Sequence, residues 1–104
     1  MICVLLFNFV VQEVIREKYG VLACQVRAFI HYQPTYYHLH VHFTHVRYES
    51  ALGTTPERAH LLEDVIDNIE REGDYYCKCN LAFGAKEHEL LTAEYRSKKP
   101  EYFQ

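Results

Sequence analysis

The sequence lacks the features that mark secreted, membrane-spanning and nucleic-acid-coating proteins. Its apolar start, residues 1–11, is interrupted by Asn8 and is much shorter than the run of about 20 apolar residues that spans a bilayer. This start has neither a basic leader nor a small-residue cleavage site, so we expect no signal peptide. The formal net charge of -3 argues against a protein built mainly to coat nucleic acid.

The sequence also lacks the cysteine spacing of a zinc site. Four cysteines are present, Cys3, Cys24, Cys77 and Cys79. Cys77 and Cys79 are separated by one residue, which is too close for the usual zinc pair, and no second pair accompanies them. We interpret all four as reduced thiols of an intracellular protein.

The length of 104 residues and the hydrophobic fraction of 49% predict one globular domain, residues 1–104, with 1–7 and 97–104 peripheral or frayed. Apolar spacing predicts helices over 9–19, 56–71 and 87–96, a helical turn over 74–78, and strands over 26–32 and 80–85. Thr55 and Pro56 have the residue types of a helix start. Leu62, Val65, Ile66 and Ile69 would form a buried stripe, Leu90, Leu91 and Tyr95 would point inward, and His60 would be structural.

Histidine is the abundant residue type, and five of the seven lie between His31 and His45. Residues 36–44 read YYHLHVHFT, an alternation typical of a half-buried strand. In such a strand, His38, His40 and His42 share one face at a spacing of roughly 6.6 Å, and Leu39, Val41 and Phe43 face the core. A core does not need a row of imidazoles, so the pattern favours a chemical or ligand-binding role.

The strand over 26–32 ends at His31 and Tyr32, and Pro34 interrupts the chain directly afterwards. The histidine strand follows at once, which predicts an antiparallel hairpin. His31 would then lie near the histidine row, either as a polar cross-strand neighbour or as a fourth contact to a ligand.

Three functions fit a row of imidazoles. In the first, the central His40 attacks a phosphate as a nucleophile while its neighbours donate hydrogen bonds to the phosphate oxygens. Imidazole suits this role because its ordinary pKa of about 6.5 leaves it mostly neutral near pH 7. In the second, the His-x-His pair holds a metal ion. In the third, the row binds nucleotide phosphates without catalysis.

A longer stretch of sequence around the histidine row favours the first of these three functions. Residues 38–44, HLHVHFT, resemble the motif of the histidine-triad (HIT) superfamily, with Thr44 as a small departure. Residues 31–44, HYQPTYYHLHVHFT, and 57–62, ERAHLL, resemble the scavenger mRNA-decapping pyrophosphatases of that superfamily, and the resemblance extends over roughly 12–91. It implies an α+β, HIT-like antiparallel sheet with packed helices.

The resemblance also implies a function. Such enzymes hydrolyse the cap remnant m7GpppN and release m7GMP, and no metal or cofactor is implied. His40 matches the nucleophile and His38 and His42 match the flanking histidines. His31 and the segment Gln33, Pro34, Thr35, Tyr36 and Tyr37 match the substrate loop. A cytoplasmic and also nuclear location is implied.

The chain resembles only the C-terminal part of these enzymes, so we expect a truncated HIT domain. Recognition of a cationic base needs a π face and a carboxylate. The sequence has no tryptophan, and no residues can be assigned to this task, so we expect cap selectivity to be lost. An incomplete sheet has an exposed edge, which predicts a homodimer or another association through that edge and no membrane partner.

Overall fold

The computed structural model describes residues 2–48 and 53–103, with side chains from Leu6 onward. Its elements are α1 (Ile2–Tyr19), η1 (Ala23–Gln25), β1 (Val26–His31), β2 (His42–His45), β3 (Ala59–Leu61), α2 (Leu62–Arg71), α3 (Tyr75–Lys78), α4 (Leu90–Lys98) and η2 (Pro100–Phe103). The predicted α+β, HIT-like fold class is confirmed. In this described part, no helix is long and apolar enough to cross a membrane.

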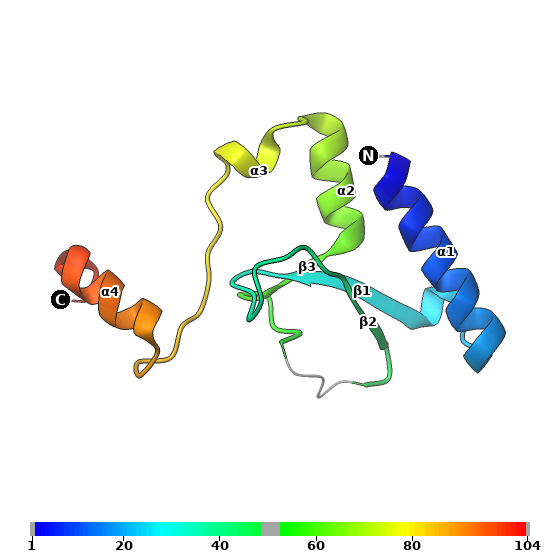
Figure 1. Cartoon of the computed structure of the whole chain (residues 1–104), viewed down its shortest axis with the longest axis horizontal. Coiled ribbons are helices and arrows are strands. Elements are labelled where there is room, and N and C mark those ends of the chain that lie inside the picture. Colours follow the sequence, from blue (N-terminus) through cyan, green and yellow to red (C-terminus); the bar gives the residue numbers. More distant parts are fainter. Residues whose placement is uncertain (1, 49–52, 104) are drawn as a thin grey trace.

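A three-stranded antiparallel sheet in the order β2-β1-β3 is the centre of the molecule (Figure 1). β1 pairs with β2 from Val26 opposite His45 to Phe29 opposite His42, which confirms the predicted hairpin. On its other side, β1 pairs with β3, with Ile30 opposite His60. The central strand is therefore fixed from both sides, and β2 and β3 form the edges.

The core lies on one face of this sheet. Ala28, Leu62 and Ile66 are buried together, and Ile30, Val41 and Phe43 pack against them. Successive strand residues face opposite sides, so Phe29 and His31 point away from this core and toward the other face. The predicted inward positions of Val41, Phe43, Leu62 and Ile66 are correct.

The predicted helix over 56–71 is wrong in its first part. Residues Ala59–Leu61 form β3, and α2 begins only at Leu62, so Thr55 is not its cap. Cross-strand pairing with β1 replaces the local helical preference there, because hydrogen bonds to a central strand satisfy the same backbone groups.

The predicted strand over 36–44 is also shorter than expected. β2 covers only His42–His45, and residues 36–41 are irregular because the pairing with β1 stops at Phe29 opposite His42. Leu39, expected in the core, is 81% exposed. Without a partner strand, the alternation in this segment no longer selects an inner face.

The C-terminal part extends away from the sheet (Figure 1). Residues 79–86, which include the predicted strand over 80–85, have no regular structure, and Leu90 is 87% exposed instead of inward. The radius of gyration is 16.4 Å, whereas a compact domain of this length has about 13 Å. Too few apolar side chains meet α4 to fold it back onto the core.

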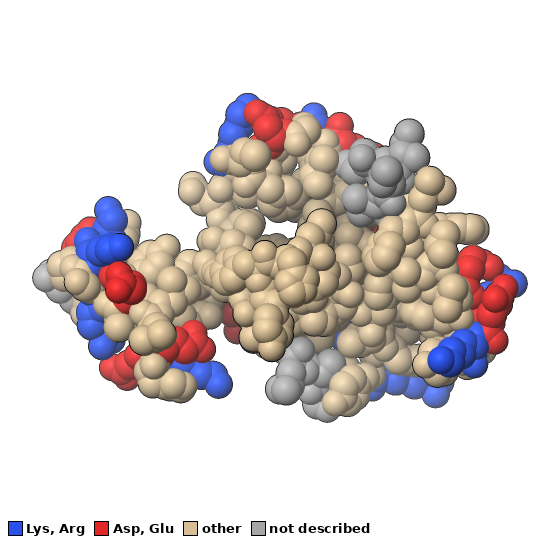
Figure 2. Space-filling model, viewed as in Figure 1, with Lys and Arg blue, Asp and Glu red and all other residues tan. Residues whose placement is uncertain are grey.

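Charged side chains collect over α3, over α4 and at the C-terminal end of α1 (Figure 2). The face between these regions carries few of them. The face seen here between these regions therefore shows no large cluster of one charge (Figure 2).

Candidate active site

The sheet places three rings in contact on the face opposite the core. Phe29 lies directly opposite His42 in the β1–β2 pair, and their rings stack with centroids 5.3 Å apart and planes at 11°. His31 follows two residues after Phe29 on the same face, and its ring centroid is 4.1 Å from that of His42. Phe29 is 1% exposed, so both imidazoles rest on a rigid apolar support.

His40 and His38 join this group from outside the strand. The ring centroid of His40 is 4.8 Å from that of His42, and the centroid of His38 is 5.6 Å from that of His40. The irregular segment thus keeps the three histidines in a continuous row even though only His42 belongs to β2. Together with His31, all four of the predicted site histidines lie in one cluster.

The backbone of His38 determines which nitrogen of His40 carries the proton. The Nδ1 atom of His40 is 2.8 Å from the carbonyl oxygen of His38. A carbonyl oxygen only accepts hydrogen bonds, so Nδ1 is the donor. In the neutral ring, the lone pair is then on Nε2, the arrangement that a nucleophilic imidazole requires.

Burial and neighbouring positive charge lower the pKa of the two histidines nearest the sheet, His31 and His42. Burial lowers the pKa of His31, and the charges of His42, Arg58 and His40 lower it further, while a hydrogen bond to Gly53 opposes the shift. Burial also lowers the pKa of His42, with additional effects of His40 and Arg58. Both imidazoles are therefore predominantly neutral near pH 7.

Arg58 is a site residue that the sequence reasoning missed. Its Nη2 atom donates to the Thr35 hydroxyl at 3.2 Å, and its carbonyl oxygen accepts from the amide of Tyr32 at 2.9 Å. Its Nε atom is buried and has no hydrogen-bond partner among the described residues. The sequence signal was a basic residue inside the string ERAHLL, but the expected helix hid its position immediately before β3.

The segment after β1 covers one side of the histidine cluster. The Tyr37 hydroxyl donates to Oε1 of Gln33, and the ring centroid of Tyr36 lies 6.1 Å from that of His38. Pro34 is half-buried, whereas Thr35, Tyr36 and Tyr37 are exposed. Thr35, through Arg58, and Tyr36, through His38, connect this predicted substrate loop to the cluster.

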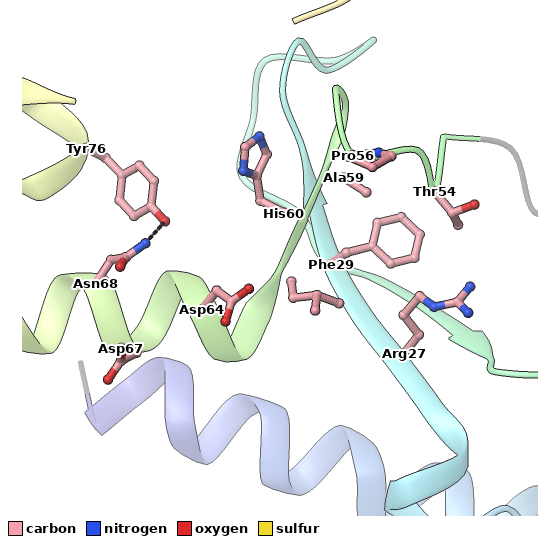
Figure 3. A pocket seen from close by; sticks show the side chains of 11 residues that line it. Arg27, Phe29, Thr54, Pro56, Ala59, His60, Asp64, Asp67, Asn68 and Tyr76 are labelled. Atoms are coloured by element: carbon pink, nitrogen blue, oxygen red, sulfur yellow. Dashed lines mark hydrogen bonds between the residues drawn. The ribbon is translucent and has the colours of Figure 1, made fainter. Parts of the chain in front are cut away.

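A separate hollow of about 550 Å³ lies around β3 (Figure 3). Phe29, Arg27 and Thr54 line one side, and α2 and α3 contribute carboxylates and other polar groups on the other. There, Asn68 donates to the Tyr76 hydroxyl at 3.0 Å. The Nε2 atom of His60, expected to be structural, is buried without a partner within the described ranges.

Metal ligands do not gather in the part that the structure describes: residues 2–48 and 53–103 contain no group of three or more His, Cys, Asp or Glu placed to hold an ion. Cys24, Cys77 and Cys79 are free thiols. The side chain of Cys3 lies outside the described residues.

The four imidazoles thus cluster beside Arg58, whose positive charge acts on His31 and His42. Sequence comparison gives a family match: residues 6–56 match the family described as "Scavenger mRNA decapping enzyme C-term binding". The resemblance to the C-terminal part of the scavenger decapping enzymes, expected from the motif, is therefore confirmed. The matched range contains every predicted site residue.

Individual relatives carry the name m7GpppX diphosphatase. The Ascaris suum protein is 51% identical over 77 residues, which are 74% of this chain and 25% of that protein. The Bos taurus protein is 46% identical over 82 residues, 79% of this chain and 24% of the relative. The Homo sapiens protein is 42% identical over 80 residues, which are 77% of this chain and 23% of that protein. The chain thus spans about a quarter of the length of these relatives.

Proposed function

We propose that this chain carries the catalytic histidines of a nucleotide pyrophosphatase that cleaves m7GpppN cap remnants and releases m7GMP. The substrate class follows from the relatives named m7GpppX diphosphatase. The chemistry is a hydrolysis in two steps through a nucleotidyl intermediate on His40.

One observation carries the proposal: the Nδ1 atom of His40 lies 2.8 Å from the His38 carbonyl. With Nδ1–H held by the backbone, the Nε2 lone pair is available to attack phosphorus without prior loss of a proton. A neutral imidazole that bound phosphate through Nε2–H would carry its lone pair on Nδ1, where the His38 carbonyl offers no proton.

The neighbouring groups supply what a phosphoryl transition state needs. His42 is neutral and can offer one N–H, and the Arg58 guanidinium adds a fixed positive charge on the same side. Donors and cations aimed at the phosphate oxygens stabilise the charge that develops there. Thr35 holds the guanidinium by a hydrogen bond and keeps it close to the cluster.

The bond changes balance as follows. His40 Nε2 forms a P–N bond with the phosphorus next to 7-methylguanosine, and the P–O bond to the neighbouring phosphate breaks. The other nucleotide leaves as a diphosphate anion with the bonding electron pair. Water then attacks the same phosphorus, loses a proton to solvent, and the P–N bond breaks to return neutral His40 and release m7GMP.

The partners are part of the same proposal. β2 and β3 are the two edges of the described sheet, and an open edge can pair with another strand. We therefore propose a homodimer, or another association through one of these edges, and a cytoplasmic and nuclear place of action. Chemical cross-linking of the full chain tests the association, and a monomer at all concentrations would contradict it.

The test of the reaction is to trap the intermediate. The full chain is mixed with m7GpppG, quenched in alkaline denaturant because phosphoramidates are acid-labile, and analysed by mass spectrometry. The expected result is an m7GMP adduct on the peptide that contains His40, absent in His40→Asn.

His45→Asn is the matched control, because His45 lies on the same strand but is paired with Val26 on the core face. This variant should form the adduct as the unaltered chain does. Binding of m7GpppG without adduct or turnover would favour the alternative in which the histidine row binds nucleotide phosphates without catalysis. Activity that depends on added zinc would favour the metal alternative.

A further inference from the structure

Gly53 touches the histidine cluster from outside the sheet. The Nε2 atom of His31 lies 2.9 Å from the Gly53 carbonyl oxygen. Because that oxygen only accepts, Nε2 carries the proton, and in the neutral ring the lone pair is on Nδ1. The Gly53 carbonyl, 22 residues further along the chain, therefore selects the tautomer of His31.

Only glycine fits at this position. Gly53 has φ +74°, in the left-handed region that side chains rarely adopt. A Cβ atom built there would lie 2.5 Å from Nε2 and 2.7 Å from Cε1 of His31. Gly20 has a similar φ of +67°, yet a Cβ atom there would meet nothing within 4 Å. The two glycines share their backbone conformation and differ in their contact with a site ring.

His31 passes this constraint to the histidine row. Its Nε2 atom contacts the Gly53 carbonyl, and its ring centroid is 4.1 Å from that of His42. The charged and titratable groups that act on it are His42, Arg58 and His40. Phe29 contacts both imidazoles, with ring centroids 5.3 Å from each. A displaced His31 would therefore displace His42 as well.

We infer that Gly53 is a positioning residue: its carbonyl holds His31 as the Nε2–H tautomer, and the ring of His31 in turn holds His42 in the row. This assigns His31, which could be either a cross-strand neighbour or a ligand contact, a supporting role toward His42. The expected effect on turnover rests on the proposed function, whereas the tautomer of His31 does not.

The test combines spectroscopy with paired variants. Long-range 15N–1H correlation spectra of the imidazoles of the full chain distinguish the protonated nitrogen of each ring. We expect Nε2–H for His31 in the unaltered chain and in Gly20→Ala, and loss of this preference in Gly53→Ala. With m7GpppG as substrate, we expect kcat of Gly53→Ala to fall roughly 10- to 100-fold with a smaller change in KM, and Gly20→Ala to keep its turnover.

The outcomes separate this inference from the proposed function. A proton on Nδ1 of His31 in the unaltered chain overturns the inference, even if Gly53→Ala fails to fold. An unchanged His31 tautomer and rate in folded Gly53→Ala overturn it as well. If the unaltered chain shows no turnover but His31 has the expected tautomer, which Gly53→Ala loses, the positioning role stands and the proposed reaction fails.

Discussion

The four clustered histidines form two pairs that are held in different ways. His31 and His42 belong to paired strands, rest on Phe29 and have lowered pKa values because they are partly buried. His38 and His40 lie on the irregular segment before β2 and are held by a local hydrogen bond between His40 and the His38 backbone. Strand pairing fixes one pair, whereas in the other pair the His38 carbonyl orients the ring of His40.

Because the two pairs are held differently, we expect them to have different roles. A supporting group benefits from rigid packing, which sets its position to a fraction of an ångström. A nucleophile must be reached by substrate and must move enough to form and break a bond with phosphorus. In the proposed reaction, the sheet-held pair, His31 and His42, provides the neutral wall of the site. The segment-borne pair, His38 and His40, provides the reactive nitrogen and the carbonyl that accepts from its ring.

The largest expected effect concerns the two histidines of the irregular segment, His38 and His40. We expect His40→Asn to lose roughly 10³-fold or more in kcat, because asparagine cannot form the covalent intermediate that we propose on His40. His38→Asn should lose much less, because its contribution to the tautomer of His40 is a backbone carbonyl that the substitution retains. Steady-state turnover of m7GpppG measures both.

Thermal unfolding alone is not a sufficient control here, because it does not report the tautomer of His40, so imidazole spectra of the two variants should accompany the kinetics. His38→Asn must keep the Nδ1–H form of His40 for the comparison to hold. Equal losses of activity in the two variants, with this tautomer intact, would show that the His38 side chain matters as much as the proposed nucleophile.

A second prediction concerns the charge beside the sheet-held pair. Arg58→Gln removes the guanidinium near His31 and His42 but keeps a hydrogen-bond donor for Thr35. We expect a loss of roughly 100-fold in kcat/KM, because a fixed positive charge no longer stabilises the phosphate oxygens. Kinetics with m7GpppG at constant ionic strength check this.

Arg47→Gln is the control for a general change in charge. Arg47 follows β2 and is exposed, and its backbone amide donates to Nδ1 of His45, which lies on the core face of the sheet. It should keep most of its activity. If both variants lose activity equally and the loss disappears at high salt, the effect is long-range attraction rather than contact with the phosphate.

The sequence predicted those parts of the fold in which local pattern and tertiary contacts agree. The hairpin, the inward positions of Val41 and Phe43, and the stripe of Leu62 and Ile66 were readable because alternation and helical spacing coincide with burial. The sequence failed where a distant partner decides. Ala59–Leu61 directly precedes α2, and its pairing with β1 makes it a strand.

The candidate site shows the same limit. The row of histidines could be recognised from alternation, although the strand that was expected to produce it stops at His42. Arg58 and Gly53 could not be placed, because their contacts with Thr35 and His31 span 23 and 22 residues. Local pattern identifies which residue types carry the chemistry, but the groups that orient them come from loops whose path depends on the whole fold.

The smallest expected effect tests the sheet-held pair by pH. The pKa values of His31 and His42 are lowered by burial first and by neighbouring positive charge second. As pH falls below their ordinary value of about 6.5, the unfolded chain binds protons on these rings before the folded chain does. The free energy of unfolding should therefore decrease from about pH 6.5 downward, until the lowered folded pKa values are passed.

Urea unfolding between about pH 7.5 and about pH 5.5 measures this slope, in the range where histidine titrates. His31→Gln removes one of the two rings and should flatten the decrease. His45→Gln, on the core face of β2, keeps both rings and should keep the slope of the unaltered chain. A slope that is lost in the His45 variant and retained in the His31 variant would mean that the sheet does not hold His31 in its neutral form.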